Sequence, residues 1–158
     1  MGRPASTGAF RSPYNGCVVD FTPQGAVKSY YEALNARDYA RAAGPIAESC
    51  EWVSMPTESR YRGPAAVVAG LREFASAFPD WHVEVERVVA SGDVVVVEWL
   101  TTGTFLKPFR GREPNGRRFS RRGCAVAEVD SGRIVRYHDY FDRASLYAQL
   151  ELMELFKP

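Results

Sequence analysis

Cysteine and histidine are scarce in this 158-residue sequence. The cysteines are Cys17, Cys50 and Cys124, and the histidines are His82 and His138. An odd number of widely separated cysteines, with no C-x-x-C pair, argues against a disulfide framework and against a zinc site. We therefore expect no bound metal and a reducing, cytoplasmic environment.

Long apolar runs, a strong net charge and nucleotide-binding motifs are also missing. No stretch approaches the roughly 20 apolar residues that span a bilayer, and the N-terminus lacks the apolar core of a signal peptide. The 20 basic and 19 acidic side chains nearly cancel, which removes the overall field that draws proteins to nucleic acid or anionic membranes. Neither a G-x-G-x-x-G sequence nor a P-loop is present. We expect no nucleic acid, membrane or cofactor as a partner.

The composition that remains is that of one ordinary globular domain. The chain is 46% hydrophobic and 13% aromatic, enough to close one core. Residues 1–22 are rich in Gly, Pro, Ser and Thr without periodicity, which is typical of a disordered arm. We therefore expect a disordered N-terminal arm over 1–22 and a single domain over 23–158.

Helical periodicity dominates the first half of that domain. Apolar residues at helical spacing predict one helix from Pro23 and a second, bent near Gly44-Pro45, over 39–47. A third begins at Gly63-Pro64, because proline suits the first helical turn. Its inward residues are Val67, Val68, Leu71, Phe74 and Phe78.

Strands dominate the second half. After a short strand over 50–54, alternation and turn signals predict strands over 81–90, 94–106, 118–129 and 133–142, followed by a last helix through 156. Hairpin-type connections do not suit a parallel sheet, whose strands need helical crossovers. We predict an α+β fold: a curved antiparallel sheet wrapped around three N-terminal helices, with a short C-terminal helix and a central conical cavity for a small molecule.

The last predicted strand carries a carboxylate, Asp139, inside an apolar run. In a strand, alternate side chains share a face. Asp139 should therefore face the cavity with Val135, Tyr137 and Phe141, and the opposite face should carry Ile134, Arg136, His138 and Tyr140. Burial raises the pKa of such a carboxyl and makes it a base able to take a proton from carbon beside a carbonyl. The alternative is a structural aspartate held by hydrogen bonds.

Aromatic side chains are candidates for the wall of the cavity, where they would bind a flat hydrophobic ligand. Most of them could equally be core residues. Trp99 shares a strand face with Val97, Thr101 and Gly103. The candidate substrate-binding residues are Tyr30, Tyr31, Trp52, Phe74, Trp99, Thr101 and Tyr137, with Trp81 and Phe105 as further aromatic neighbours.

A basic cluster covers the loop after the third predicted strand and the start of the fourth. It could receive an anionic substrate group, or it could be a solvated hairpin edge. We expect His138 at a subunit interface or in solvent, and Asp142 as a helix cap. The cluster comprises Lys107, Arg110, Arg112, Arg117, Arg118, Arg121 and Arg122.

Three segments carry a family resemblance: GLREFASAFPDWHVEVERVVASGDVVVVEWLTTGTF, PNGRRFSRRGCAVAEVDSGRIVRYHDYFD and LYAQL. With the order of elements, they resemble the SnoaL-like branch of the nuclear transport factor two superfamily over most of 24–152. That superfamily includes polyketide cyclases, ketosteroid isomerases, limonene-epoxide hydrolases, hydroxylase-like proteins and non-catalytic binding modules. The resemblance therefore implies the fold more specifically than the reaction.

Residue by residue, the resemblance singles out Asp139 in YHDYFD, which matches the acid/base aspartate of the cyclases. Other positions depart from the related patterns. Ala125 replaces a polar residue of the cyclases, Trp99 and Thr101 stand where the epoxide hydrolases place Arg and Asp, and Met55 stands where ketosteroid isomerases have their base. These departures disfavour epoxide hydrolysis and steroid isomerisation.

The resulting hypothesis is a cofactor-independent enzyme acting on a hydrophobic carbonyl-bearing small molecule. It would be a polyketide cyclase or isomerase with Asp139 as acid/base. One alternative is epoxide opening with Asp139 activating the nucleophile and Tyr30 or Tyr31 as proton donor; another is a non-catalytic binding module. We also expect a homodimer, because the outer sheet face would leave Ile134 and Tyr140 to cover.

Overall fold

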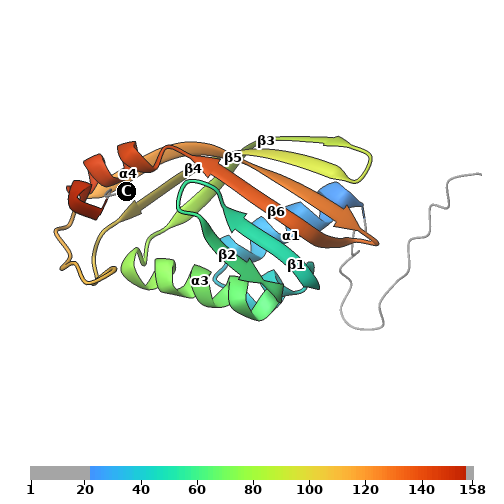
Figure 1. Cartoon of the computed structure of the whole chain (residues 1–158), viewed down its shortest axis with the longest axis horizontal. Coiled ribbons are helices and arrows are strands. Elements are labelled where there is room, and N and C mark those ends of the chain that lie inside the picture. The colour runs from blue at the N-terminus through green and yellow to red at the C-terminus, as the bar shows by residue number, and fades with distance from the viewer. Residues whose placement is uncertain (1–21, 156–158) are drawn as a thin grey trace, which may run out of the picture.

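The computed structural model describes residues 22–155, so the expected arm over 1–22 lies outside the described residues except for Thr22 (Figure 1). In the described part, a curved sheet lies over helices α1 and α3, and α4 lies near the end of the sheet where β6 finishes. No helix of this part is long and apolar enough to cross a membrane. The elements are α1 (Pro23–Asn35), α2 (Tyr39–Ala43), β1 (Ile46–Ser54), β2 (Ser59–Arg62), α3 (Gly63–Ala77), β3 (His82–Ser91), β4 (Val94–Thr104), β5 (Arg118–Asp130), β6 (Arg133–Phe141), α4 (Arg143–Gln149) and a final 3₁₀ turn (Met153–Leu155).

Within residues 22–155 the sheet has six strands in the order β2-β1-β6-β5-β4-β3. All neighbouring strands are antiparallel except β1 and β6, which are parallel. The α+β class and the curved sheet are confirmed, but the sheet is mixed rather than wholly antiparallel. The reason is that residues 55–132 separate β1 from β6, so no hairpin fixes their relative direction.

The region between α1 and α3 differs from the sequence prediction. The second helix ends at Ala43 rather than near 47, because Pro45 cannot continue it and the chain enters β1 at Ile46. β1 is longer than expected, and it forms an unpredicted hairpin with β2. Polar residues at 48, 49 and 51 interrupt the alternation of β1, and β2 is a short basic segment, so neither showed a strand pattern.

Local signals explain where the two long helices begin. The Thr22 side chain caps α1 by accepting a hydrogen bond from the backbone N–H of Gly25 at 3.1 Å. α3 begins at Gly63, which has φ of 73°. A side chain there would place its Cβ 2.9 Å from the carbonyl oxygen of Glu48, so glycine is required where α3 meets β1.

A bulge changes the face of one residue on β6. The β5–β6 register shifts between Glu128 and Val129, and Ile134 consequently pairs with Val129. Ile134 is fully buried in the core, so the expectation that it lies on the outer face is wrong. A bulge adds one residue to a strand, which reverses the alternation beyond it. Tyr140, on the other side of the bulge, is 41% exposed, as the alternation predicted.

Candidate active site

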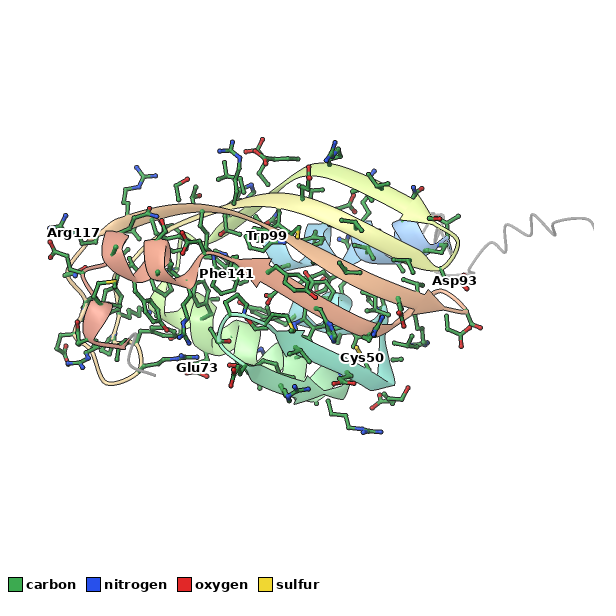
Figure 2. All side chains as sticks on the ribbon, turned by 45° about the horizontal axis from the view of Figure 1, so that its top comes forward. Cys50, Glu73, Asp93, Trp99, Arg117 and Phe141 are labelled. Carbon is green, nitrogen blue, oxygen red and sulfur yellow. The ribbon has the colours of Figure 1, made fainter. Side chains whose placement is uncertain are left out.

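A cavity of about 160 Å³ lies between α3, the β1–β2 turn, the ends of β5 and β6, and α4. Figure 2 shows Trp99 and Phe141 close together, with Glu73 of α3 below them in this view; Phe141 and Glu73 both line the cavity. An engineered protein cavity of about 150 Å³ holds a benzene molecule, so this cavity can enclose one ring. Its lining is largely aromatic and aliphatic, with Ser54, Thr57, Ser59, Glu73, Arg110, Arg121, Asp139 and Arg143 as polar members.

Asp139 lines this cavity from β6. It lies opposite Ser54 on β1 and Ala125 on β5, so the strand on one side offers a hydroxyl and the other only a methyl group. Its Oδ1 is buried and has no hydrogen-bond partner among the described residues. Burial raises the pKa of Asp139 to about 6, against the opposing effects of the Ser54 hydroxyl and the Arg121 charge. The carboxyl therefore changes protonation near neutral pH.

Arg121 lines the same cavity from β5. Its guanidinium carbon lies 3.7 Å from the ring centroid of Phe141 and within 6 Å of three further rings, those of Trp99, Phe74 and Phe119. Rings attract a cation through their electron-rich faces without neutralising it. Burial lowers the pKa of Arg121 to about 10, so the side chain remains positively charged at neutral pH.

The cation and the carboxylate face the cavity without being joined. Within residues 22–155, Arg121 makes one hydrogen bond, from Nε to the Thr101 hydroxyl at 3.0 Å, and it forms no ion pair with Asp139. Both terminal Nη groups are therefore left without a protein acceptor in the described chain. A ligand in the cavity can meet a base and a cation together.

Gly123 leaves the space in which the Trp99 indole lies beside Arg121. It stands opposite Trp99 in the β4–β5 register and opposite Phe141 in the β5–β6 register. A Cβ at this glycine would lie 2.4 Å from Cη2 of Trp99 and 2.5 Å from the backbone oxygen of Tyr140. The indole therefore lies directly over the glycine, beside Arg121.

A tyrosine cluster lies in the core close to Asp139. The hydroxyls of Tyr31 and Tyr137 are 2.5 Å apart, and Tyr137 stacks on Trp52 with ring centroids 3.5 Å apart. Burial raises the pKa of Tyr30, Tyr31 and Tyr137, and the Asp139 charge adds to the rise. These phenols stay neutral over the range in which Asp139 titrates.

The structure separates the candidate substrate-binding residues into three groups. Trp52 and Phe74 line the cavity. Trp99 and Thr101 are buried and contact Arg121, so they lie behind the lining. Tyr30, Tyr31 and Tyr137 belong to the core and are not among the lining residues. Of the two further aromatic residues, Trp81 lines the cavity and Phe105 is fully buried in the core.

The residues of the basic cluster also separate into groups, with some at the surface and others in the cavity lining. Arg117 and Arg122 form surface ion pairs with Glu151 and Glu86, as a solvated edge would. Arg110 and Arg121 line the cavity. The signal that could have separated Arg121 is its alternation with Phe119, Ala125 and Ala127 on the inner face of β5. The neighbouring arginines made this alternation hard to recognise in the sequence.

The remaining candidates are outside the cavity. Asp142 caps α4, as predicted, by accepting a hydrogen bond from the backbone N–H of Ser145 at 2.9 Å. His138 is half-buried, and its Nε2 has no hydrogen-bond partner in the described chain. Within residues 22–155, no three His, Cys, Asp or Glu side chains come together in a group that could hold a metal ion.

The model of the SnoaL-like polyketide cyclase family matches residues 24–150, which is most of the chain. The chain belongs to this family. The fold agrees with IdmH from Streptomyces antibioticus, a proposed polyketide cyclase, at a TM-score of 0.72 and 25% identity, covering 82% of this chain and 98% of that one. AclR from Streptomyces galilaeus, a proposed hydroxylase, gives a TM-score of 0.72 and 22% identity, with 82% and 95% coverage. A SnoaL-like protein from Jannaschia gives 0.74 and 20%, with 90% and 97% coverage. No curated protein sequence matches the chain.

Membership of the SnoaL-like family and the similarity to IdmH support a role of the polyketide cyclase type. At 22% and 20% identity, AclR and the Jannaschia protein support the fold alone. The reaction therefore has to be argued from the cavity and its charged residues.

Proposed function

We propose that this protein is a cofactor-independent cyclase or isomerase that acts on a hydrophobic, carbonyl-bearing small molecule, with Asp139 as acid and base. The observation that carries the proposal is the position of Asp139 in an aromatic cavity, where burial raises its pKa to about 6. A base with a pKa near the working pH combines a high deprotonated fraction with a useful driving force for proton transfer.

The proposed reaction has two steps. The Asp139 carboxylate first takes a proton from the carbon beside a carbonyl, which leaves an enolate and a neutral carboxyl. The enolate carbon then attacks a second carbonyl carbon of the same molecule, a carbon–carbon bond forms, and the resulting alkoxide takes the proton back from Asp139. The net reaction closes a ring without gaining or losing protons. Isomerisation differs only in that the proton returns to another carbon.

The size of the cavity limits how a substrate can bind. A volume of about 160 Å³ encloses one ring. A polycyclic substrate would place its reacting end against Asp139 and keep its other rings at the entrance. The aromatic residues Trp52, Phe74 and Trp81 would contact the enclosed ring.

Epoxide opening has less support. It requires a proton donor for the epoxide oxygen, and Tyr30 and Tyr31, which the sequence suggested for this role, are not among the residues that line the cavity. A non-catalytic binding module would use the same cavity without proton transfer. The deuterium-exchange experiment described next distinguishes the binding module from the enzyme.

The test is deuterium exchange at carbon in the purified protein. Single-ring aryl ketones and 1,3-diketones are incubated with protein in D₂O, and loss of the α-proton signal is followed by NMR. The wild type should accelerate exchange, and Asp139→Asn should reduce the acceleration by about 100-fold or more while ligand affinity changes little. Asp142→Asn is the matched control, because asparagine also caps helices well and should leave exchange unchanged.

Two results would contradict the proposal. Full exchange activity in a folded Asp139→Asn variant would move the base elsewhere. Binding of these ketones without any exchange in the wild type would favour the binding module. Circular dichroism and thermal melting establish that each variant is folded before its exchange rate is compared.

A further inference from the structure

Arg121 is half-buried in the cavity lining, and the partial loss of hydration lowers its pKa. Moving a cation out of water is unfavourable, and a buried cation is ordinarily paired with an anion. Within residues 22–155 the one hydrogen bond of its side chain goes to a neutral hydroxyl, and the guanidinium packs against the rings of Phe141 and Trp99. The cavity is the place where its unpaired Nη groups can find an acceptor.

We propose that Arg121 is a second catalytic residue, which binds the substrate carbonyl oxygen and stabilises the oxyanion that forms when Asp139 removes the α-proton. This inference rests on the proposed function and adds to it the group that receives the negative charge. A preorganised cation beside the developing charge lowers the barrier without reorganising during the reaction.

Proton transfer preserves the balance of charge between Asp139 and Arg121. Before transfer, a carboxylate and a guanidinium lie beside a neutral ketone. After transfer, the Asp139 carboxyl is neutral and the enolate carries the negative charge, so Arg121 faces one negative charge from this pair throughout. Glu73, Arg110 and Arg143 also line the cavity and take no part in this transfer.

The lack of an ion pair between the two side chains in the described residues leaves both able to meet one ketone. Arg121 and Asp139 interact electrostatically, yet no ion pair joins them in the described residues. A carbonyl oxygen and the hydrogen on the adjacent carbon lie on neighbouring atoms of one molecule. One bound ketone can therefore meet both groups, with its oxygen towards the guanidinium and its hydrogen towards the carboxylate.

The test uses 4-nitrophenol, a single-ring probe whose anion is yellow and resembles an aryl enolate in charge distribution. Asp139→Asn is the host protein, because its neutral amide imitates the protonated carboxyl present beside the enolate. In this host the phenolate should bind at least about tenfold more tightly than the phenol, since a hydrogen bond to a charged group contributes about 1.5–3 kcal/mol. Absorbance titrations at several pH values give both affinities.

Removing the cation should abolish this preference. In Asp139→Asn/Arg121→Met the phenolate should bind no more tightly than the phenol, and Arg121→Lys in the same host should restore part of the preference. The control is Arg122→Gln in that host, because Arg122 is the next residue, its side chain is 71% exposed, and it pairs with Glu86 at the surface. Arg122→Gln should leave the preference unchanged.

Three results would overturn the inference: an unchanged preference after Arg121→Met, no preference in Asp139→Asn alone, or no binding of the probe at millimolar concentration. The test requires no turnover, so it is independent of whether Asp139→Asn loses exchange activity. If Arg121→Met fails to fold, the preference in Asp139→Asn and its partial retention in Arg121→Lys still decide the question. In the exchange reaction, Arg121→Met should lower kcat more than it raises KM.

Discussion

The guanidinium of Arg121 stacks on the ring of Phe141, with 3.7 Å between the guanidinium carbon and the ring centroid. Phe141 ends β6 two residues after Asp139, so one strand provides both the carboxylate and the ring that holds the cation. Stacking stabilises the charge without supplying an anion. The cation is thereby kept in place and kept available to a ligand.

The first prediction concerns Gly123. Gly123→Ala should destabilise the fold by about 1–3 kcal/mol, because its Cβ would overlap the Trp99 indole and the backbone oxygen of Tyr140. Urea unfolding measures the change. The control is Gly92→Asn, since Gly92 has a positive φ that asparagine tolerates and a Cβ there meets nothing within 4 Å. Equal stability of Gly123→Ala and wild type would mean that the indole does not occupy this position.

The second prediction concerns pH. If the Asp139 carboxylate is the base, kcat/KM for exchange should rise about tenfold per pH unit below about 6 and level off above it. Two kinds of neighbour keep their charge state in this range: Arg121, whose pKa is about 10, and the phenols of Tyr30, Tyr31 and Tyr137, whose pKa is raised by burial. A rate that falls on raising the pH through 6 would indicate that the protonated carboxyl is the active form.

Local sequence signals predicted the turn before β6, β6 itself and the start of α4, but the expected last helix through 156 is wrong, because α4 ends at Gln149 and only a short 3₁₀ turn follows at Met153–Leu155. Gly132 adopts the positive φ of a turn, β6 follows with its apolar residues, and Asp142 caps α4. Alternation counted from Asp139 placed that residue on the inner face, where it lines the cavity. These features depend on residues close together in the chain, which is why sequence reasoning could reach them.

Features that depend on distant segments were not predictable in the same way. The parallel pairing of β1 with β6 and the bulge that turns Ile134 inward arise from strand pairing across the sheet. The position of Arg121 in the cavity lining was not predicted for another reason. Arg121 lies in the segment 117–122, whose other arginines are exposed, and only the alternation of β5 distinguishes it.

The third prediction is the oligomeric state. We expect a homodimer through the outer face of the sheet, where Tyr140 is 41% exposed and Cys124 and Val126 are partly exposed on the adjacent strand. Light scattering at micromolar concentration should give twice the monomer mass, and Tyr140→Glu should shift the mass towards the monomer. Leu106→Glu, at an exposed apolar residue beyond the end of β4, should not. A wild-type monomer would contradict the expectation.

The last prediction links Asp139 to stability. The rise of its pKa from 3.8 to about 6 means that, between these values, the folded protein holds a proton which the unfolded chain has released. Stability therefore falls as the pH rises through this window, by up to about 3 kcal/mol, and is constant above it with respect to this group. An asparagine carries no charge at any pH and lacks this loss.

Asp139→Asn should consequently be more stable than the wild type at about pH 7.5, by an amount of this order, and the difference should vanish towards about pH 4. Urea unfolding of both proteins at a series of pH values measures it, and all other titrating groups cancel in the comparison. A stability difference that stayed the same at both ends of the series would mean that Ser54 and Arg121 fully offset the cost of burying the carboxylate. The base strength required of Asp139 would then have no source in the cavity.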